Sequence, residues 1–541
     1  MEVISAESAE LEGQTARNAR GHALDAVDQV CTIMTLMETN KRATRTRKWP
    51  PWAGFPPACA VLAVFAAVLP LLSCAAGDEP SADPLGEPHG SAEPRDLPPM
   101  SGGIQVNEPN LEDWVNAVRS AGLDSVQVTL YARQLAWSSS EMWFTTDAPS
   151  VVDEIRAAHA AGLRVVLVMR SALEHAVPEN RHLWHGMIWP SDDDEIDTWF
   201  SRYREFLLWG ADLAQREGVE LLAIGSELNS LTSTVQITEL PDLYQYFLDP
   251  ERTAVVRGRL VECATTVPDT WLEPDLEFRD GTRYESLDAF LRAEEEANRA
   301  WTRVVTGWRA GEVDLQQLNR RRARYDRLWR ELIAETRQHY EGPLTYAANF
   351  DQVTEVGFWD ALDAVGVNAY YSLSRWGLAG SELDEELTES WREIAAELES
   401  LGRDLATTPL PLIFLELGWT RKAGSTVRPF SYHRIEVLET VGRQPDGEVP
   451  LTCVHWATQP EDAGERVRAL RALLRVVREG ALPQLRGFML WKLTTLPQHR
   501  EVEPFVVVLP GRDDTAARGD EDFLQVAAEI ATELRREGGS R

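Results

Sequence analysis

The segment VVDEIRAAHAAGLRVVLVMR, residues 151–170, contains the pattern that decides the fold. Its first half has the apolar spacing of a helix and ends at Gly162, the residue type that most often closes a helix. Its second half, residues 164–170, is an apolar run of the length of a buried strand. A helix that leads through a glycine into a buried strand is typical of a parallel βα unit.

The same unit recurs along the chain from Gly103 onward. Helices are predicted over residues 111–120, 151–161, 196–216 and 523–535, and eight apolar runs have the character of buried strands. These runs are residues 103–107, 125–131, 164–170, 220–226, 343–349, 364–370, 411–416 and 486–491. Eight such strands that alternate with helices predict an α/β fold of the (β/α)8 TIM barrel type rather than an open sheet.

The connection between the fourth and fifth runs is much longer than the others. It spans residues 227–342, far more than a loop and one helix need. Residues 286–309 and 315–339 within it are predicted to be charged helices. We therefore expect a helical insertion at about 235–340, on the side of the barrel where substrates bind. Its composition fits a lid, part of a subsite or an oligomer contact.

The overall charge excludes one class of partner. The chain of 541 residues has 54 basic and 86 acidic side chains, a formal charge of −32. Phosphate binding needs a concentrated positive surface, so nucleic acid is not an expected partner. The 19 tryptophans serve either as core residues or as platforms for sugar rings.

The N-terminal region has the features of an export signal. Basic residues between Lys41 and Lys48 precede an apolar run, Ala58–Leu72, that is too short to span a membrane. The following Leu71-Leu72-Ser73-Cys74 resembles a bacterial lipobox, which implies lipidation of Cys74 and an exported cell-envelope lipoprotein held to the membrane by its lipid alone. An ordinary signal peptide or an uncleaved anchor are the alternatives.

The predicted organisation follows from this signal. Residues 1–73 are an extension plus signal peptide, 74–100 an acidic, proline-rich tether, and 101–541 the barrel. The signal begins late, and a translation start at Met34 or Met37 would give it ordinary proportions.

Two cysteines remain in the barrel. Cys263 and Cys453 allow one disulfide, and two free thiols are the alternative. The sequence shows no Cys/His cluster of the kind that binds zinc, and we expect neither a metal nor a cofactor.

Two glutamates follow predicted strands directly. Glu227 comes just after the fourth run, and Glu416 lies at the tip of the seventh. A carboxylate next to a buried strand is costly without a partner or a task, and the carboxyl ends of barrel strands carry the active site. Retaining glycosidases need two carboxyl groups about 5–5.5 Å apart. The alternative is that each glutamate is a salt-bridged residue at the rim.

A resemblance to a known family rests on motifs that occur in order. The motifs are Trp184-His185-Gly186-Met187-Ile188-Trp189-Pro190-Ser191-Asp192, Ile224-Gly225-Ser226-Glu227-Leu228, Tyr346-Ala347-Ala348-Asn349-Phe350-Asp351, Gly366-Val367-Asn368-Ala369-Tyr370-Tyr371, Leu415-Glu416-Leu417-Gly418-Trp419 and Trp491-Lys492. They resemble glycoside hydrolase family 113, β-mannanase-type (β/α)8 barrels of clan A. The resemblance implies that Glu227 is the acid/base and Glu416 the nucleophile, with an oligo- or polysaccharide as substrate.

The resemblance also implies substrate-binding residues at strand ends. One tyrosine after the sixth run is expected to hydrogen-bond the nucleophile, and Tyr370 is preferred to Tyr371. Tryptophans would stack on sugars while polar side chains bind hydroxyls; the alternative is that the tryptophans plug the barrel mouth and the lysine pairs with a carboxylate. The candidates are Trp184, His185, Asn349, Tyr370, Trp419, Trp491 and Lys492.

The chain departs from the family pattern at three places. Ser226 replaces the usual asparagine before the acid/base, Met169-Arg170 replaces Lys-Pro-His after strand three, and residues 493–496 lack an acidic residue. We therefore expect a retaining hydrolase of β-linked mannan or a related β-hexose glycan. Its alternatives are a catalytically idle glycan-binding lipoprotein and an exo-acting β-glycosidase of different specificity.

The expected chemistry predicts opposite surroundings for the two glutamates. Glu227 should be protonated, in an apolar surround or near a negative charge, whereas Glu416 should be ionised among donors.

Overall fold

A computed structural model describes residues 95–538 except 96, 147, 175, 240–246, 265–282, 310, 376, 406–408, 430–434, 440–450, 456–460, 502 and 511–519. The predicted signal segment, Cys74 and most of the tether lie outside the described residues and stay predictions. None of the helices in the described ranges has the length and hydropathy that a membrane span requires.

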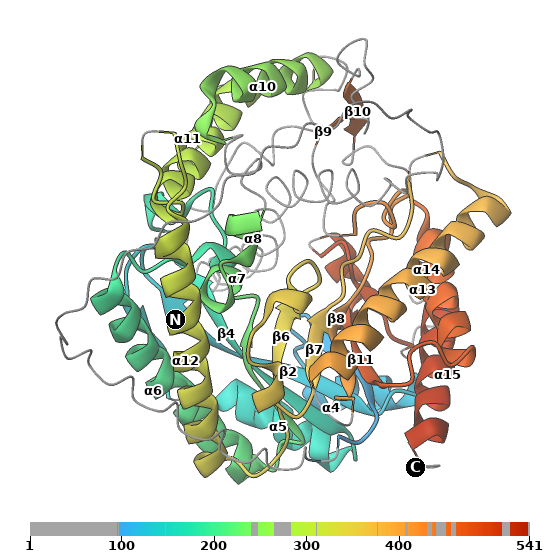
Figure 1. Cartoon of the computed structure of the whole chain (residues 1–541). Helices are drawn as coiled ribbons and strands as arrows, with labels where there is room; N and C mark the ends of the chain where they lie inside the picture. The colour runs from blue at the N-terminus through green and yellow to red at the C-terminus, as the bar shows by residue number, and fades with distance from the viewer. Residues whose placement is uncertain are drawn as a thin grey trace, which may run out of the picture.

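Eight parallel strands form a closed barrel at the centre of the molecule (Figure 1). They are β1 (Met100–Gln105), β2 (Ser125–Gln134), β4 (Arg164–Leu173), β5 (Leu221–Ser226), β6 (Leu344–Asn349), β7 (Val365–Asn368), β8 (Leu412–Leu417) and β11 (Leu485–Thr494). The order runs β1-β11-β8-β7-β6-β5-β4-β2, and pairing of β1 with β2 closes it. The predicted (β/α)8 barrel is confirmed.

Helices surround this barrel (Figure 1). The outer helices are α4 (Leu111–Ser120), α5 (Pro149–Ala160), α6 (Asp193–Glu217), α12 (Leu315–His339), α13 (Gly380–Leu405), α14 (Ala463–Arg478) and α15 (Glu521–Gly538). Their ends follow local chemistry: the Asp192 side chain caps α6 by accepting from the Glu195 backbone N–H, and Gly218 closes the helix with φ 73°.

Shorter elements lie mainly in the connections. The helices are α7 (Asn229–Thr232), α8 (Val235–Glu239), α10 (Pro250–Ala264) and α11 (Leu287–Val305), with 3-10 turns η1 (Pro178–Asn180), η2 (His185–Met187), η5 (Val353–Glu355), η6 (Trp359–Ala361) and η8 (Pro497–Glu501). The short strands are β3 (Met142–Trp143) on β2, β12 (Val507–Val508) on β11, and the antiparallel pair β9 (Ile435–Glu439) and β10 (Leu451–His455).

The first strand begins three residues earlier than predicted. Gly102 lies inside β1 because β2 approaches so closely that a Cβ would fall 1.8 Å from the Ser125 carbonyl oxygen. Asn107 has a φ of 43°, which turns the chain out of the strand. Gly102 therefore marks a close contact between neighbouring strands within β1.

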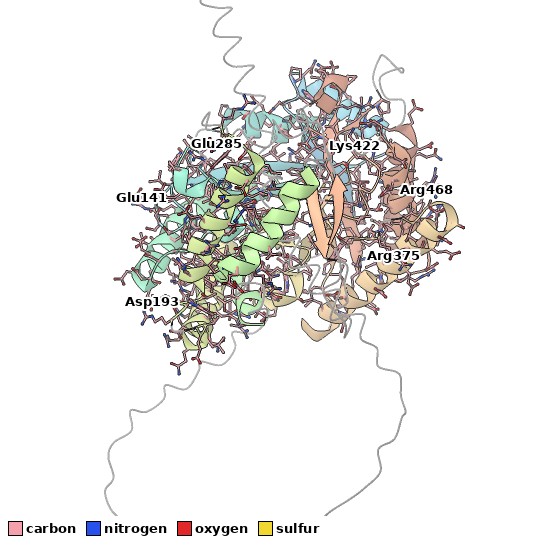
Figure 2. All side chains as sticks on the ribbon, turned by 90° about the horizontal axis from the view of Figure 1, so that it is seen from above. Glu141, Asp193, Glu285, Arg375, Lys422 and Arg468 are labelled. Atoms are coloured by element: carbon pink, nitrogen blue, oxygen red, sulfur yellow. The ribbon has the colours of Figure 1, made fainter. Side chains whose placement is uncertain are left out.

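The long connection contains both predicted helices. Helix α12 packs along α6 and leads directly into β6, so it completes the outer ring, whereas α11 and α10 extend beyond the carboxyl end of the barrel (Figure 1). Seen from above, α10 lies beside the β9–β10 pair (Figure 2). Cys263 and Cys453 belong to α10 and β10, but their side chains lie outside those described, so the disulfide stays a prediction.

Candidate active site

Glu227 leaves the end of β5 in a strained backbone conformation. Its φ is 51°, which costs a residue with a side chain about 1–2 kcal/mol. Two hydrogen bonds hold the turn: the Glu227 N–H donates to the Ala347 carbonyl at 2.9 Å, and the Leu228 N–H donates to the Tyr346 hydroxyl oxygen at 2.7 Å. Such strain, maintained by neighbouring strands, is characteristic of functional positions.

Glu416 lies near the end of β8, where the strand pairing is irregular. Val367 of β7 pairs with Phe414, but the next residue, Asn368, pairs with Glu416, so β8 contains one extra residue. Such a bulge interrupts the alternation of side chains and can redirect one of them. Glu416 is only 4% exposed, and its carboxylate accepts a hydrogen bond from the Tyr370 hydroxyl at 2.9 Å.

The hydrogen bond predicted between Tyr370 and Glu416 is therefore present. The neighbouring Tyr371 instead packs against Phe350 and Trp391, with ring centroids 5.4 and 6.1 Å away.

Arg170, in the carboxyl-terminal half of β4, contacts both glutamates. Its Nη2 donates to Glu227 Oε2 at 2.7 Å, and its Nη1 lies 3.2 Å from Glu416 Oε1. All three side chains are buried, Arg170 being 6% exposed. From the sequence this arginine was noted only as a departure from a family pattern, and its contact with both carboxylates was not predicted.

His185, in the turn η2, also contacts Glu227. Its Nε2 lies 3.2 Å from Glu227 Oε2, and burial lowers the pKa of the ring. A neutral ring in the tautomer protonated at Nε2 donates to the carboxylate. The edge of Trp184 packs on His185, with centroids 5.0 Å apart, and Gly186 is required because a Cβ there would collide with the Trp184 ring.

The insertion supports this loop. The Trp301 indole of α11 donates to the Met187 carbonyl at 2.8 Å, two residues beyond His185. The Arg321 guanidinium of α12 donates to the Pro190 and Ser191 carbonyls. The long connection thus fixes the segment that presents His185 to Glu227.

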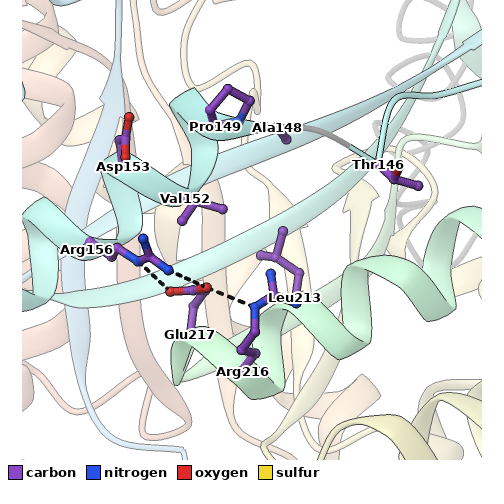
Figure 3. A pocket seen from close by; sticks show the side chains of 9 residues that line it. All are labelled: Thr146, Ala148, Pro149, Val152, Asp153, Arg156, Leu213, Arg216 and Glu217. Carbon is purple, nitrogen blue, oxygen red and sulfur yellow. Dashed lines mark hydrogen bonds and ion pairs between the residues drawn. The ribbon is translucent and has the colours of Figure 1, made fainter.

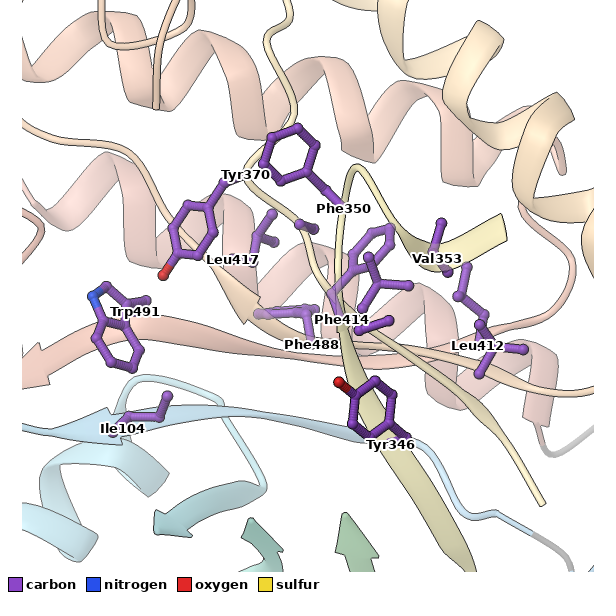
Figure 4. Packing of buried hydrophobic residues seen from close by; sticks show 14 of the residues in the cluster. Ile104, Tyr346, Phe350, Val353, Tyr370, Leu412, Phe414, Leu417, Phe488 and Trp491 are labelled. Atoms are coloured by element: carbon purple, nitrogen blue, oxygen red, sulfur yellow. The ribbon is translucent and has the colours of Figure 1, made fainter. Parts of the chain in front are cut away.

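Trp491 and Lys492 come from the end of β11. Lys492 Nζ lies 3.4 Å from Glu503 Oε2 and 4.2 Å from the centre of the Trp491 ring, while the Arg170 guanidinium lies 5.6 Å from that ring. Trp491 and Tyr370 lie on the left side of the hydrophobic cluster in Figure 4, with the Tyr370 hydroxyl directed toward the Trp491 side. Pairing of Lys492 with a carboxylate is the alternative considered from the sequence, and Glu503 supplies that carboxylate.

Two predicted candidates have local partners. The Asn349 side chain accepts from the Phe350 N–H at 3.0 Å, and Trp419, 1% exposed, packs edge-on against Trp391. Contacts of Asn349 and Trp419 with a sugar stay predictions.

Asn368 and Tyr131 were not among the residues predicted from the sequence. Asn368 is fully buried at the end of β7, where its side-chain amide donates to the Ser226 hydroxyl at 3.5 Å and contributes to the lowered pKa of Glu227. Tyr131 pairs in register with Arg170 and is 52% exposed. Position at a strand end was the available signal for both, because β2 and β7 end at the same rim as β5 and β8.

The surroundings push the pKa values of the two glutamates apart. Burial tends to raise the pKa of Glu227, but the hydrogen bond from His185 and the charge of Arg170 outweigh it, and the pKa is lowered. Burial dominates for Glu416 and, despite Arg170, raises its pKa with help from the Glu227 charge. The expected pattern is thus reversed in the free protein, because Arg170 and His185 both donate to Glu227.

A separate surface hollow lies between α5 and α6 (Figure 3). Its charged lining pairs internally, since Arg156 and Arg216 both donate to Glu217. The hollow is therefore a weaker candidate than the buried carboxylate pair at the barrel mouth.

The Tyr370→Phe substitution should lower kcat roughly 10- to 150-fold. Loss of a hydrogen bond to a charged group costs about 1.5–3 kcal/mol, and here the bond holds Glu416, one of the two carboxylates expected to react. Steady-state kinetics on an oligosaccharide measure the effect, with Tyr371→Phe as the matched control. Equal losses in both variants would contradict a specific role for Tyr370.

Comparison with known proteins gives one family match. The model of Glycoside Hydrolase Family 113 matches residues 105–236 and 313–444, which make up just under half of the chain and include Glu227 and Glu416. The unmatched residues between these segments fall in the long connection that contains α10 and α11. A search of curated proteins found no match.

Solved structures of low identity are similar to the chain. One is a GH113 β-mannanase from Alicyclobacillus acidocaldarius, 17% identical, with a TM-score of 0.46 over 81% of this chain and 99% of that one. Another is a GH113 β-1,4-mannanase, 16% identical, with a TM-score of 0.45 over 82% of this chain and 100% of that one.

Proposed function

We propose that the chain belongs to glycoside hydrolase family 113 and hydrolyses β-linked mannan, or a related β-hexose glycan, with net retention of anomeric configuration. The observation that carries this proposal is the pair Glu227 and Glu416, buried at the ends of β5 and β8 and joined by Arg170. The family match includes both glutamates.

The pair suits a double displacement. A Glu416 oxygen attacks the anomeric carbon while Glu227 gives its proton to the glycosidic oxygen, so the glycosidic bond breaks as a glycosyl ester forms. Water then attacks the same carbon, Glu227 takes a proton from it, and Glu416 leaves as a carboxylate. Contact of both carboxyl groups with one guanidinium supports the short separation that direct attack requires.

The charges around the pair support a neutral sugar. Among the described side chains, the cations Arg170 and Lys492 face the carboxyl groups of Glu227, Glu416 and Glu503. With one proton on the reacting pair these charges balance. Among the side chains that the structure describes at this site, no excess cation is then left to bind the carboxylate of a uronic acid.

Time-resolved proton NMR of mannohexaose hydrolysis tests the reaction. A retaining enzyme releases the β-anomer first, and the α-anomer appears later by mutarotation. Initial release of the α-anomer would contradict the mechanism, and mannose as the sole early product would indicate the exo-acting alternative. Binding of mannohexaose without any product would favour the idle glycan-binding protein.

Parallel reactions with cello- and xylo-oligosaccharides establish the sugar specificity. Faster cleavage of either than of mannohexaose would refute the preference for mannan while leaving the carboxylate mechanism in place.

Export as a lipoprotein is proposed from the sequence alone. The residues concerned, including Cys74, lie outside those that the structure describes. Mass spectrometry of the mature N-terminus tests the proposal: a lipidated peptide that begins at Cys74 is expected, and an unmodified N-terminus elsewhere would refute it.

A further inference from the structure

Arg170 has a position that the double displacement does not by itself explain. Among the described residues it is the side chain that contacts both reacting carboxylates, and it comes from the strand end where the sequence departs from the family pattern. We propose that Arg170 is a positioning residue that holds the carboxyl groups of Glu227 and Glu416 at a fixed distance from each other and limits the pair to a single shared proton. The proposal rests on the proposed function of the pair.

The shape of the guanidinium suits the first task. Its terminal nitrogens form a rigid planar fork, so one group can hold two carboxylates at a fixed spacing. The contact of 2.7 Å to Glu227 involves Nη2 and the contact of 3.2 Å to Glu416 involves Nη1, so both terminal nitrogens are used. A lysine at this position would carry the same charge but would lack two donor nitrogens at a fixed spacing.

The charge of the guanidinium suits the second task. Burial tends to lower the pKa of Arg170, but the charges of Glu416 and Glu227 outweigh it and raise the pKa, so the group stays cationic. A cation beside two carboxyl groups lowers both of their pKa values, whereas burial and their mutual repulsion raise them. Without the cation, the second proton would stay on the pair to higher pH, so the ionised nucleophile would form only at higher pH.

The other titratable or charged groups near Arg170 and the two glutamates do not change the charge balance of the pair. They come from β2, η2, the end of β7 and β11, and are Tyr131, His185, Tyr370 and Lys492. Burial and the charge of Glu416 raise the pKa of Tyr370, so its hydroxyl stays neutral, and burial keeps His185 neutral by lowering its pKa. Lys492 is paired with Glu503. Arg170 is therefore the cation in direct contact with the pair.

The contacts of Arg170 with both glutamates also account for the reversed pKa pattern of the free protein. The shorter Arg170 contact goes to Glu227, which leaves the shared proton on Glu416. Catalysis needs the proton on Glu227. Because Arg170 already reaches both groups, the proton can change sides while the closer contact moves from Glu227 to Glu416.

The Arg170→Gln variant tests the proposal through the pH profile of kcat/KM. Activity requires one proton on the pair, so it falls below the lower and above the upper pKa of the free enzyme. Removal of the cation should raise both pKa values, by roughly 1–3 pH units, and should move both limbs of the profile to higher pH. Limbs that stay in place while kcat falls would show a merely structural role and overturn the proposal.

Two further variants separate charge from shape. Arg170→Lys should keep both limbs within about 0.3 unit while kcat falls roughly tenfold or more, because the charge remains and the fork is lost. Shifted limbs or an unchanged kcat in Arg170→Lys would contradict the proposal. This test remains valid if the Arg170→Gln variant does not fold. Arg337→Gln removes an arginine that pairs with Asp363 just before the start of β7, at the opposite end of the barrel, and should leave both limbs unmoved.

A measurement without substrate distinguishes failure of this proposal from failure of the proposed function. The infrared C=O band of protonated carboxyl groups should contain a component that disappears in the double variant Glu227→Gln/Glu416→Gln. In Arg170→Gln this component should persist to higher pH than in the wild type. If this component is present in a wild-type protein that shows no hydrolase activity, only the proposed function is refuted. If the component titrates at the same pH in Arg170→Gln as in the wild type, the proposed role of Arg170 is refuted.

Discussion

Replacement of Glu416 by alanine is expected to lower kcat by about 10⁴-fold or more while the protein stays folded, because the nucleophile of the covalent step is lost. Glu416 is buried, contacts Tyr370 and Arg170, and lies at a bulge that redirects its side chain. Glu416 holds the shared proton in the free protein, so its loss leaves Arg170 paired with Glu227, and the variant should remain folded by circular dichroism.

Azide provides the diagnostic measurement for the Glu416→Ala variant. With a substrate whose leaving group is a dinitrophenolate, azide can enter the vacated space and attack the anomeric carbon directly. A single displacement inverts the carbon, so the product from a β-glycoside should be the α-glycosyl azide. A β-azide, or residual activity near that of the wild type, would assign the nucleophile to another residue.

Glu154→Ala is the matched control for the Glu416→Ala variant. Glu154 is a buried glutamate on α5, bonded to Gln105, and its pKa is raised to about 7 by burial. Its removal should alter stability without a large change in kcat. Comparable kinetic losses at Glu154 and Glu416 would mean that the assay reports damage to the fold rather than chemistry.

The strands of the barrel were predictable because each carries its own signal. A parallel strand buried on both faces is a continuous apolar run, and residues 164–170 and 220–226 show this without any knowledge of their neighbours. The start of β1 was not predictable in this way. It depends on how closely β2 approaches Gly102, which only the closed barrel determines.

The site was predictable to the extent that it depends on strand ends. Glu227, Glu416 and Tyr370 follow apolar runs, so their shared rim could be inferred from the strand count. The contact of Arg170 with both glutamates spans residues far apart in the sequence and depends on the barrel register. The reversed pKa pattern depends on that contact and could not be read from residue types alone.

The second large effect is expected for Glu227→Ala. Loss of general acid catalysis should lower kcat about 10²- to 10⁴-fold on an oligosaccharide, whose leaving group needs a proton. A dinitrophenyl glycoside needs no such proton, so its first step should be nearly unaffected and a glycosyl-enzyme should accumulate on Glu416. The two substrates measured side by side, with mass spectrometry of the intact protein, report both effects.

Azide should again restore turnover in Glu227→Ala, but with the opposite stereochemistry. Azide needs no general base, so it attacks the accumulated intermediate, and two successive inversions yield the β-glycosyl azide. Opposite azide products from Glu227→Ala and Glu416→Ala would assign the two roles independently of the pKa pattern in the free protein. The same product from both variants would contradict the assignment, since each carboxylate acts on a different face of the sugar.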